Sequence, residues 1–300
     1  MIRTVLGDIS CGQLGRTLVH EHICCYSEPL FQMSGNHYLD KEALISASVR
    51  YLRELKSSHH LNTFMDCTPP NIGRDLELLK EVSYASEVNI IGSTGFYYTQ
   101  EPILYNTNAA TIARCMEQDI ASHPIGIIKC AVEDPEISDF SKKLLQATAM
   151  AHLDSGLPIV MHTNARNRNG LPALELLLEA GVDPRAVTVG HLSDTDDLDY
   201  VSRIASYGCF IGFDRLYDNP TEEYLSRTAQ KIKTLAGSGF ADRILLSHDA
   251  LFFNGFESQP VIHEKPRFAY CFDSILPRLP ASLGAQIMVD NPARMMLANR

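Results

Sequence analysis

The chain has 300 residues, of which 45% are hydrophobic and 21% charged, an ordinary globular composition with enough length for one large core. It holds no apolar run of about 18 residues, so we expect no membrane span. It begins without the apolar segment of a secretory signal, so we do not expect secretion. The net charge of −10 disfavours nucleic acid and anionic membrane as partners. We therefore expect a single domain over residues 1–300 whose partner is a small molecule.

The eight cysteines form no Cys-x-x-Cys pair. Cys67, Cys130 and Cys209 lie inside apolar runs, where a small buried thiol is the expected state. Unpaired thiols are typical of a reducing compartment, so we expect a cytoplasmic protein without a structural zinc knot.

Short apolar or β-branched runs alternate along the chain with longer stretches of helical spacing. The predicted strands are Thr17–His22, Thr63–Cys67, Val88–Ser93, Ile125–Ala131, Pro158–His162, Val187–His191, Cys209–Phe213 and Ile244–His248. The predicted helices are Lys41–Ser57, Arg74–Glu87, Asn106–Ser122, Ser138–Ser155, Leu171–Ala180, Asp196–Ser206 and Thr221–Ala236.

Eight strands that alternate with helices predict an α/β fold, a single (β/α)8 TIM barrel. The competing fold, a doubly wound open sheet, normally carries a glycine-rich phosphate loop after an early strand. The sequence contains no Gly-x-Gly-x-x-Gly motif, which favours the barrel. The segment Met1–Gly15 is expected to form a short N-terminal hairpin that plugs the bottom of the barrel.

Ionisable side chains stand near the ends of five predicted strands. On the first strand, His20 and His22 point to one face while Glu21 points to the other, because side chains alternate along a strand. The further residues of this kind are Lys129, His162, His191 and Asp249. Catalytic groups of a TIM barrel gather at the carboxyl ends of its strands, so these six residues predict a metal site.

The other histidines fit this pattern less well. His248 directly precedes Asp249, so on a strand it faces away from the barrel axis and is expected to contact a neighbouring element. Arg166 and Arg168 follow His162 and are expected to cap a helix or face solvent, with contact to an anionic substrate as the alternative. Solvation or an ordinary hydrogen bond is expected for His37, His59, His60, His123, His152 and His263.

Several segments together carry a family resemblance. They are Leu18–His22, Gly126–Lys129, His162–Gly170, Val189–Asp197, Ile211–Arg215, Leu246–Asp249 and Asn291–Arg294. Through them the chain resembles the phosphotriesterase family of the amidohydrolase superfamily, and especially its lactonase branch. The resemblance implies a binuclear centre of two divalent metal ions, for which zinc is expected and manganese, cobalt or iron are alternatives.

The resemblance also divides the ligands between the two ions and makes Lys129 the bridge. An ammonium group has no lone pair to donate, so bridging requires the carbamate that carbon dioxide forms on this lysine in the family. The implied ligands are His20, His22 and Asp249 for the more buried ion, and His162 and His191 for the more exposed one.

The implied activity is metal-dependent hydrolysis, in which a hydroxide shared by the two ions attacks the substrate. Asp249, a metal ligand, would also act in catalysis by accepting and passing on the proton of that hydroxide. The expected substrates are small or sugar-type lactones, with weak phosphotriesterase activity. An amide or N-acyl hydrolase on the same metals, and a non-catalytic binding protein on this fold, are the alternatives. A homodimer is the expected assembly.

Three residues are expected to bind substrate. Tyr97 and Tyr98, after the third strand, match a family position near the bound ring, although packing at the barrel rim is an alternative. Arg215 matches an arginine typical of the lactonase branch, with a salt bridge to Asp214 or Asp218 as the alternative.

The apolar wall of the substrate site must be built without tryptophan, because the chain has none. Phe252, Phe253 and Phe256, after the eighth strand, are the candidates. This favours small lactones over long-chain acyl-homoserine lactones.

Overall fold

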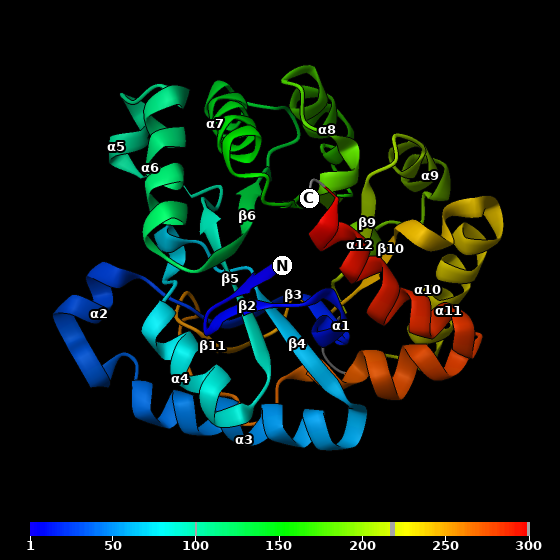
Figure 1. The fold of residues 1–300 in the computed structure, drawn as a ribbon, viewed down its shortest axis with the longest axis horizontal. Helices are drawn as coiled ribbons and strands as arrows, with labels where there is room; N and C mark the ends of the chain where they lie inside the picture. The colour runs from blue at the N-terminus through cyan, green and yellow to red at the C-terminus, as the bar shows by residue number, and fades with distance from the viewer. Residues whose placement is uncertain (100, 217–219, 299–300) are drawn as a thin grey trace.

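A computed structural model describes residues 1–99, 101–216 and 220–298. The fold is the expected (β/α)8 barrel, with parallel strands at its centre and a ring of helices outside (Figure 1). Among the described residues the strands follow the order β10-β9-β8-β7-β6-β5-β4-β3-β11. Their bounds are β3 Arg16–Cys25, β4 Leu61–Asp66, β5 Asn89–Gly95, β6 Ile125–Ala131, β7 Ile159–His162, β8 Val187–Val189, β9 Phe210–Phe213, β10 Ile244–Leu246 and β11 Leu251–Asn254.

The barrel closes because the two ends of this sheet, β10 and β11, are consecutive pieces of one strand. β10 pairs with β9, and β11 pairs with β3, where Leu251 lies opposite His22. Between the two pieces, the amide of Asp249 donates to the carbonyl of His20, and the amide of His22 donates to the carbonyl of Ala250. The eighth strand is therefore interrupted where it meets the first.

The predicted helices are all present, with ends that shift by a few residues. Side chains at the helix starts accept hydrogen bonds from the first turn, as Asp40 does for α3 and Ser138 for α7. The helices are α3 Lys41–His59, α4 Leu76–Ser86, α6 Ala109–Ser122, α7 Asp139–Ser155, α8 Gly170–Glu179, α9 Leu198–Ser206 and α10 Glu222–Leu235, with shorter α1 Cys11–Leu14, α2 Glu28–Ser34, α5 Pro102–Tyr105, α11 Ala281–Ala285 and α12 Asn291–Leu297. No helix in the described part of the chain is both long and apolar enough to cross a membrane.

One end of the barrel is filled with apolar side chains. The antiparallel hairpin of β1 (Ile2–Thr4) and β2 (Gly7–Ile9) lies across the centre of the ring in Figure 1. Ile2 is fully buried, in one cluster with Phe210 of β9 and Met295 of α12. Since the hairpin and α12 occupy this end, polar groups can gather only at the opposite, carboxyl ends of the strands.

Candidate metal centre

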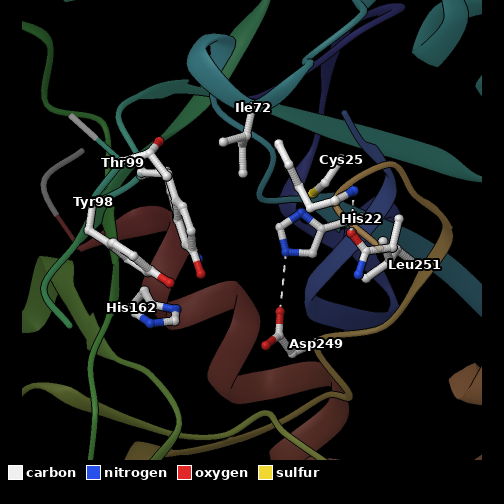
Figure 2. A pocket seen from close by; sticks show the side chains of 12 residues that line it. His22, Cys25, Ile72, Tyr98, Thr99, His162, Asp249 and Leu251 are labelled. Atoms are coloured by element: carbon white, nitrogen blue, oxygen red, sulfur yellow. Dashed lines mark hydrogen bonds and ion pairs between the residues drawn. The ribbon is translucent and has the colours of Figure 1, made fainter. Parts of the chain in front are cut away.

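The first strand supplies two histidines that meet Asp249. His20 and His22, two residues apart on β3, both reach the barrel interior, with ring centroids 5.8 Å apart. The Oδ1 atom of Asp249 lies 3.2 Å from His22 Nε2 and 3.8 Å from His20 Nε2. Figure 2 shows the contact between His22 and Asp249 at the cavity wall. These three side chains form one group of donor atoms close enough to hold a metal ion.

Two further histidines converge beside this group. His162 is the last residue of β7, and His191 follows β8; their Nδ1 and Nε2 atoms lie 2.8 Å apart. The second oxygen of Asp249 lies 3.8 Å from His191 Nε2, so this carboxylate faces both pairs of histidines. Lys129 of β6 is buried, with its Nζ atom 2.5 Å from His20 Nε2. The structure therefore brings together all six residues that the sequence singled out.

The backbone contributes to this convergence at two positions. His191 and Asp249 have φ angles of 64° and 52°, in the left-handed region that non-glycine residues rarely adopt. Both residues lie just past a strand end, where this conformation turns the side chain toward the barrel axis. Such backbone strain is typical of functional sites.

Asp214, which the sequence analysis did not propose for the site, orients two of the histidines. It follows β9 and is fully buried. Its Oδ2 atom lies 2.6 Å from His20 Nδ1, and its Oδ1 atom lies 3.1 Å from His191 Nδ1. A carboxylate at Nδ1 keeps the proton there, which leaves the Nε2 lone pair of each ring directed toward the centre.

His22 and His162 also have partners outside the centre. The Thr68 hydroxyl donates to the carbonyl of Cys24, so its oxygen accepts from His22 Nδ1 at 2.8 Å. Glu133 lies 2.9 Å from His162 Nε2. Thr68 and Glu133 follow strand ends like the expected ligands, but polar residues are common in such loops, so their sequence positions alone did not select them.

Arg215 binds acidic residues and does not line the cavity. Its Nε and Nη2 atoms donate to Oδ2 of Asp249 at 3.0 and 2.9 Å, and Nη1 donates to Asp194 at 2.9 Å. This placement differs from the expected substrate contact. The alternative expectation was a salt bridge with Asp214 or Asp218. Arg215 instead pairs with Asp249 and Asp194, and Asp218 lies outside the described residues. Arg215 thus holds one oxygen of Asp249 and leaves the other toward His22.

Glu21 points away from the centre, as strand alternation predicts, and binds the residues around Asp249. Its Oε1 atom accepts from the Ser247 hydroxyl at 2.7 Å and from the amide and ring Nδ1 of His248 at 2.9 and 2.6 Å. Its Oε2 atom accepts from the amide of Ala250 at 3.0 Å. His248 thereby makes the kind of contact with a neighbouring element that was expected for it.

The local charges favour donor atoms with free lone pairs. Burial, together with the Lys129 ammonium, lowers the pKa of His20 to about 3. Burial and the adjacent His191 hold the pKa of His162 well below its usual value. Burial opposes ionisation of Asp249, but His191, His22 and Arg215 outweigh it and keep its pKa well below the usual range. Neutral imidazoles and ionised carboxylates are a donor set that fits divalent transition metals.

The pKa of His22 shifts in the opposite direction. Burial lowers it, but Cys25 and Asp249 outweigh burial and raise it to about 10. The extra proton pairs His22 with the Asp249 carboxylate. A cation held by this pair would replace that proton, since metal ligands must be deprotonated.

A cavity of about 440 Å³ opens above these residues (Figure 2). Tyr97 and Tyr98 line it, with ring centroids 5.2 and 5.7 Å from that of His162. They therefore lie where a substrate near His162 would meet them. Ile72, Leu251 and Phe256 add apolar wall, while Thr99 and Asn254 add polar groups.

The prediction that Phe252 and Phe253 form this wall is wrong. Both are buried in the hydrophobic core, where Phe252 packs on Phe268 and Phe253 on Tyr38. The reason is that β11 continues to pair with β3 as far as Asn254, so these residues belong to a strand rather than to a loop. Only Phe256, beyond the end of β11, lines the cavity.

These features define a barrel protein with a candidate metal centre at the carboxyl ends of its strands. The model of the phosphotriesterase family matches residues 1–296, and the chain belongs to this family. It is 32% identical over 253 residues to an aryldialkylphosphatase of Saccharolobus solfataricus, covering 81% of this chain and 79% of that protein. It is 28% identical to a phosphotriesterase homology protein of Mycobacterium tuberculosis and to an N-acetyltaurine hydrolase of Salmo salar, each match covering 98% of this chain and 97% of the relative.

We predict that Glu21→Gln lowers the stability of the metal-free protein. In the variant, the side-chain NH2 group faces donors that contact the Glu21 carboxylate in the wild type. A buried donor that is left without an acceptor lowers the free energy of unfolding by about 1–3 kcal/mol. Urea unfolding of the metal-free variant measures the effect. Glu136→Gln, the same change at an exposed carboxylate, serves as the control. Equal stability of the two variants would contradict the role of Glu21.

Proposed function

We propose that this chain is a metal-dependent hydrolase with a binuclear centre, acting on small neutral lactones. His20, His22 and Asp249 would hold one ion, and His162 and His191 the other. When bound, two divalent cations polarise the scissile carbonyl and lower the pKa of a water molecule. The proposal is supported by membership of the phosphotriesterase family and by the convergence of histidine side chains on one carboxylate.

Lys129 is proposed as the bridging ligand, in the form of a carbamate. Its side chain is only 1% exposed, and its Nζ atom lies among the proposed ligands. An ammonium group at this position would repel two cations, whereas a carbamate offers negative charge and two oxygens. Burial on an apolar strand, beside the proposed ligands, supports a role for this lysine in the centre rather than on the surface.

Asp249 is proposed to accept the proton of the attacking water. Its two oxygens have different surroundings, because Oδ1 faces His22 while Oδ2 is held by Arg215. Arg215 in turn binds Asp194, so the carboxylate cannot rotate without breaking these ion pairs. We infer that Arg215 serves the reaction by fixing Asp249 rather than by touching the substrate.

The observation that carries the substrate class is the charge of the cavity wall. Among the described residues that line the cavity, Lys129 is the single lysine, and no arginine lines it. Since Lys129 is assigned to the metals, an anionic substrate in this cavity would find no cationic side chain outside the proposed ligands. Lys265 and Arg267 line the adjoining cavity, which shares Asp249, Leu251 and Asn254 with this one. A neutral ring fits between the phenol groups of Tyr97 and Tyr98 and the apolar Leu251 and Phe256, with Thr99 and Asn254 to bind its oxygens.

Amide hydrolysis is the second candidate. It is supported by the similarity to the N-acetyltaurine hydrolase of Salmo salar, which extends over 98% of this chain. The same donor set would serve an amide, because polarisation of the carbonyl and attack by water are common to both reactions. Weak phosphotriester hydrolysis is proposed as a side activity, in line with the similarity to the aryldialkylphosphatase.

We predict that the zinc-loaded protein binds about two equivalents of metal and that Lys129→Ala loses at least one of them. Elemental analysis after dialysis measures both. Added short carboxylates should restore part of the loss, because they can bridge two cations. Saturation of the active wild-type protein near one equivalent would refute the binuclear centre.

We predict that Asp249→Asn lowers kcat far more than it raises KM. Asparagine can still offer an oxygen to a metal, but it cannot accept the proton. Loss of a general base usually costs about 100- to 10,000-fold. Steady-state kinetics with metal content measured on the same preparation provide the test, and near-normal turnover with both metals bound would remove Asp249 from proton transfer.

We predict that kcat/KM for small lactones exceeds that for phosphotriesters by orders of magnitude, and exceeds that for N-acyl amides with an anionic tail. The wall offers hydrogen-bonding groups to a polar ring and no counter-charge to an anion. The assay compares the three classes on one metal-loaded preparation. Faster turnover of the anionic amides would overturn the lactonase assignment while leaving the metal centre intact.

A further inference from the structure

Each of the four histidines in the centre has a partner at its outer ring nitrogen, but these partners differ in exposure. Asp214, which serves His20 and His191, and Thr68, which serves His22, are buried. Glu133, which serves His162, is 36% exposed at its side chain. The group that orients His162 is therefore the one in contact with solvent.

Glu133 lies on the loop after β6, four residues beyond Lys129. Its Oε2 atom lies 2.9 Å from His162 Nε2, and its Oε1 atom accepts from Asn164 Nδ2 at 2.7 Å. Its backbone carbonyl accepts from Asn167 Nδ2 at 3.1 Å. These contacts of Glu133 connect the loop after β6 to the end of β7 and to the loop that follows it.

The contact with Glu133 determines which nitrogen of His162 can bind a metal. A carboxylate can only accept, so it keeps the imidazole proton on Nε2 and leaves the lone pair on Nδ1. Nδ1 is the atom that lies 2.8 Å from His191 Nε2. The other tautomer would place a proton between the two rings, where the second ion is proposed to bind.

We propose that Glu133 is a positioning residue that fixes His162 as an Nδ1 ligand and thereby sets the affinity of the more exposed metal. This inference rests on the proposed binuclear centre. It implies that the two ions differ in binding affinity. The partners of His20 and His22, which are Asp214 and Thr68, are shielded from water, whereas Glu133, the partner of His162, is not. Outer partners of metal ligands typically change metal affinity by about 10- to 100-fold.

The test is a metal titration of metal-free wild type, Glu133→Ala, Glu133→Gln and Glu136→Ala, with Zn²⁺ and a competing chelator. Wild type and the control Glu136→Ala should each bind two equivalents, and the variant should match wild type in its affinity for each ion. Glu136 is an exposed carboxylate of the same loop. Glu133→Ala should keep the first equivalent and bind the second about 10- to 100-fold more weakly. Glu133→Gln should recover part of this affinity, since its amide oxygen can still accept from Nε2.

The outcomes separate this inference from the proposed function. If Glu133→Ala binds both equivalents as wild type does, or loses affinity for both alike, the role of Glu133 is refuted while the binuclear centre stands. If wild type itself binds a single equivalent, the binuclear centre fails, and this inference fails with it. Thermal unfolding of the metal-free variants monitors the fold, and Glu133→Gln, the smaller change, provides the comparison should Glu133→Ala unfold.

Discussion

The closure of the barrel at its last strand is the constraint on which the site depends. The strand must pair with β9 on one side and with β3 on the other, and it breaks at residues 247–250, where Asp249 turns inward. The break exposes backbone donors that a regular strand would pair. Glu21 accepts hydrogen bonds from two of these amides, those of His248 and Ala250, so one buried carboxylate takes the place of the missing backbone acceptors. Glu21, which lies between His20 and His22 on β3, thereby positions Asp249 beside these two histidines.

This arrangement links stability to the geometry of the site. Among the described residues, no lysine or arginine hydrogen-bonds to Glu21; its partners are the Ser247 hydroxyl, two backbone amides and the ring of His248. That hydroxyl oxygen also accepts from the amide of His20, which connects the same contact to the first proposed ligand. A buried carboxylate is costly unless it is fully satisfied. Here these donors to Glu21 all come from residues 247–250, the segment that carries Asp249, while Glu21 itself lies on the strand that carries His20 and His22.

Much of this architecture could be predicted from the sequence, because its signals are local. Alternating apolar runs indicated the barrel, and residues such as His162 stand at the end of a run that is visible in the chain. Asp214 had the same signal, a polar residue after Ile211-Gly-Phe, but its role depends on two rings from other strands. Phe252 and Phe253 were misassigned because pairing across the barrel closure extends β11, and closure is a tertiary property that a linear pattern does not contain.

The contrast between Arg215 and the cavity wall shows where specificity can reside in such a site. Arg215 binds Asp249 and Asp194, so replacing it would disturb the proposed proton acceptor for every substrate alike. Side chains that could discriminate between substrates must instead face the cavity without contacting the ligands, as Ile72 and Phe256 do. Both stand outside the barrel strands, where a changed side chain leaves the donor set untouched. The relatives of this chain include an aryldialkylphosphatase and an N-acetyltaurine hydrolase, and the loops are where such proteins can differ without a change in the proposed donor set.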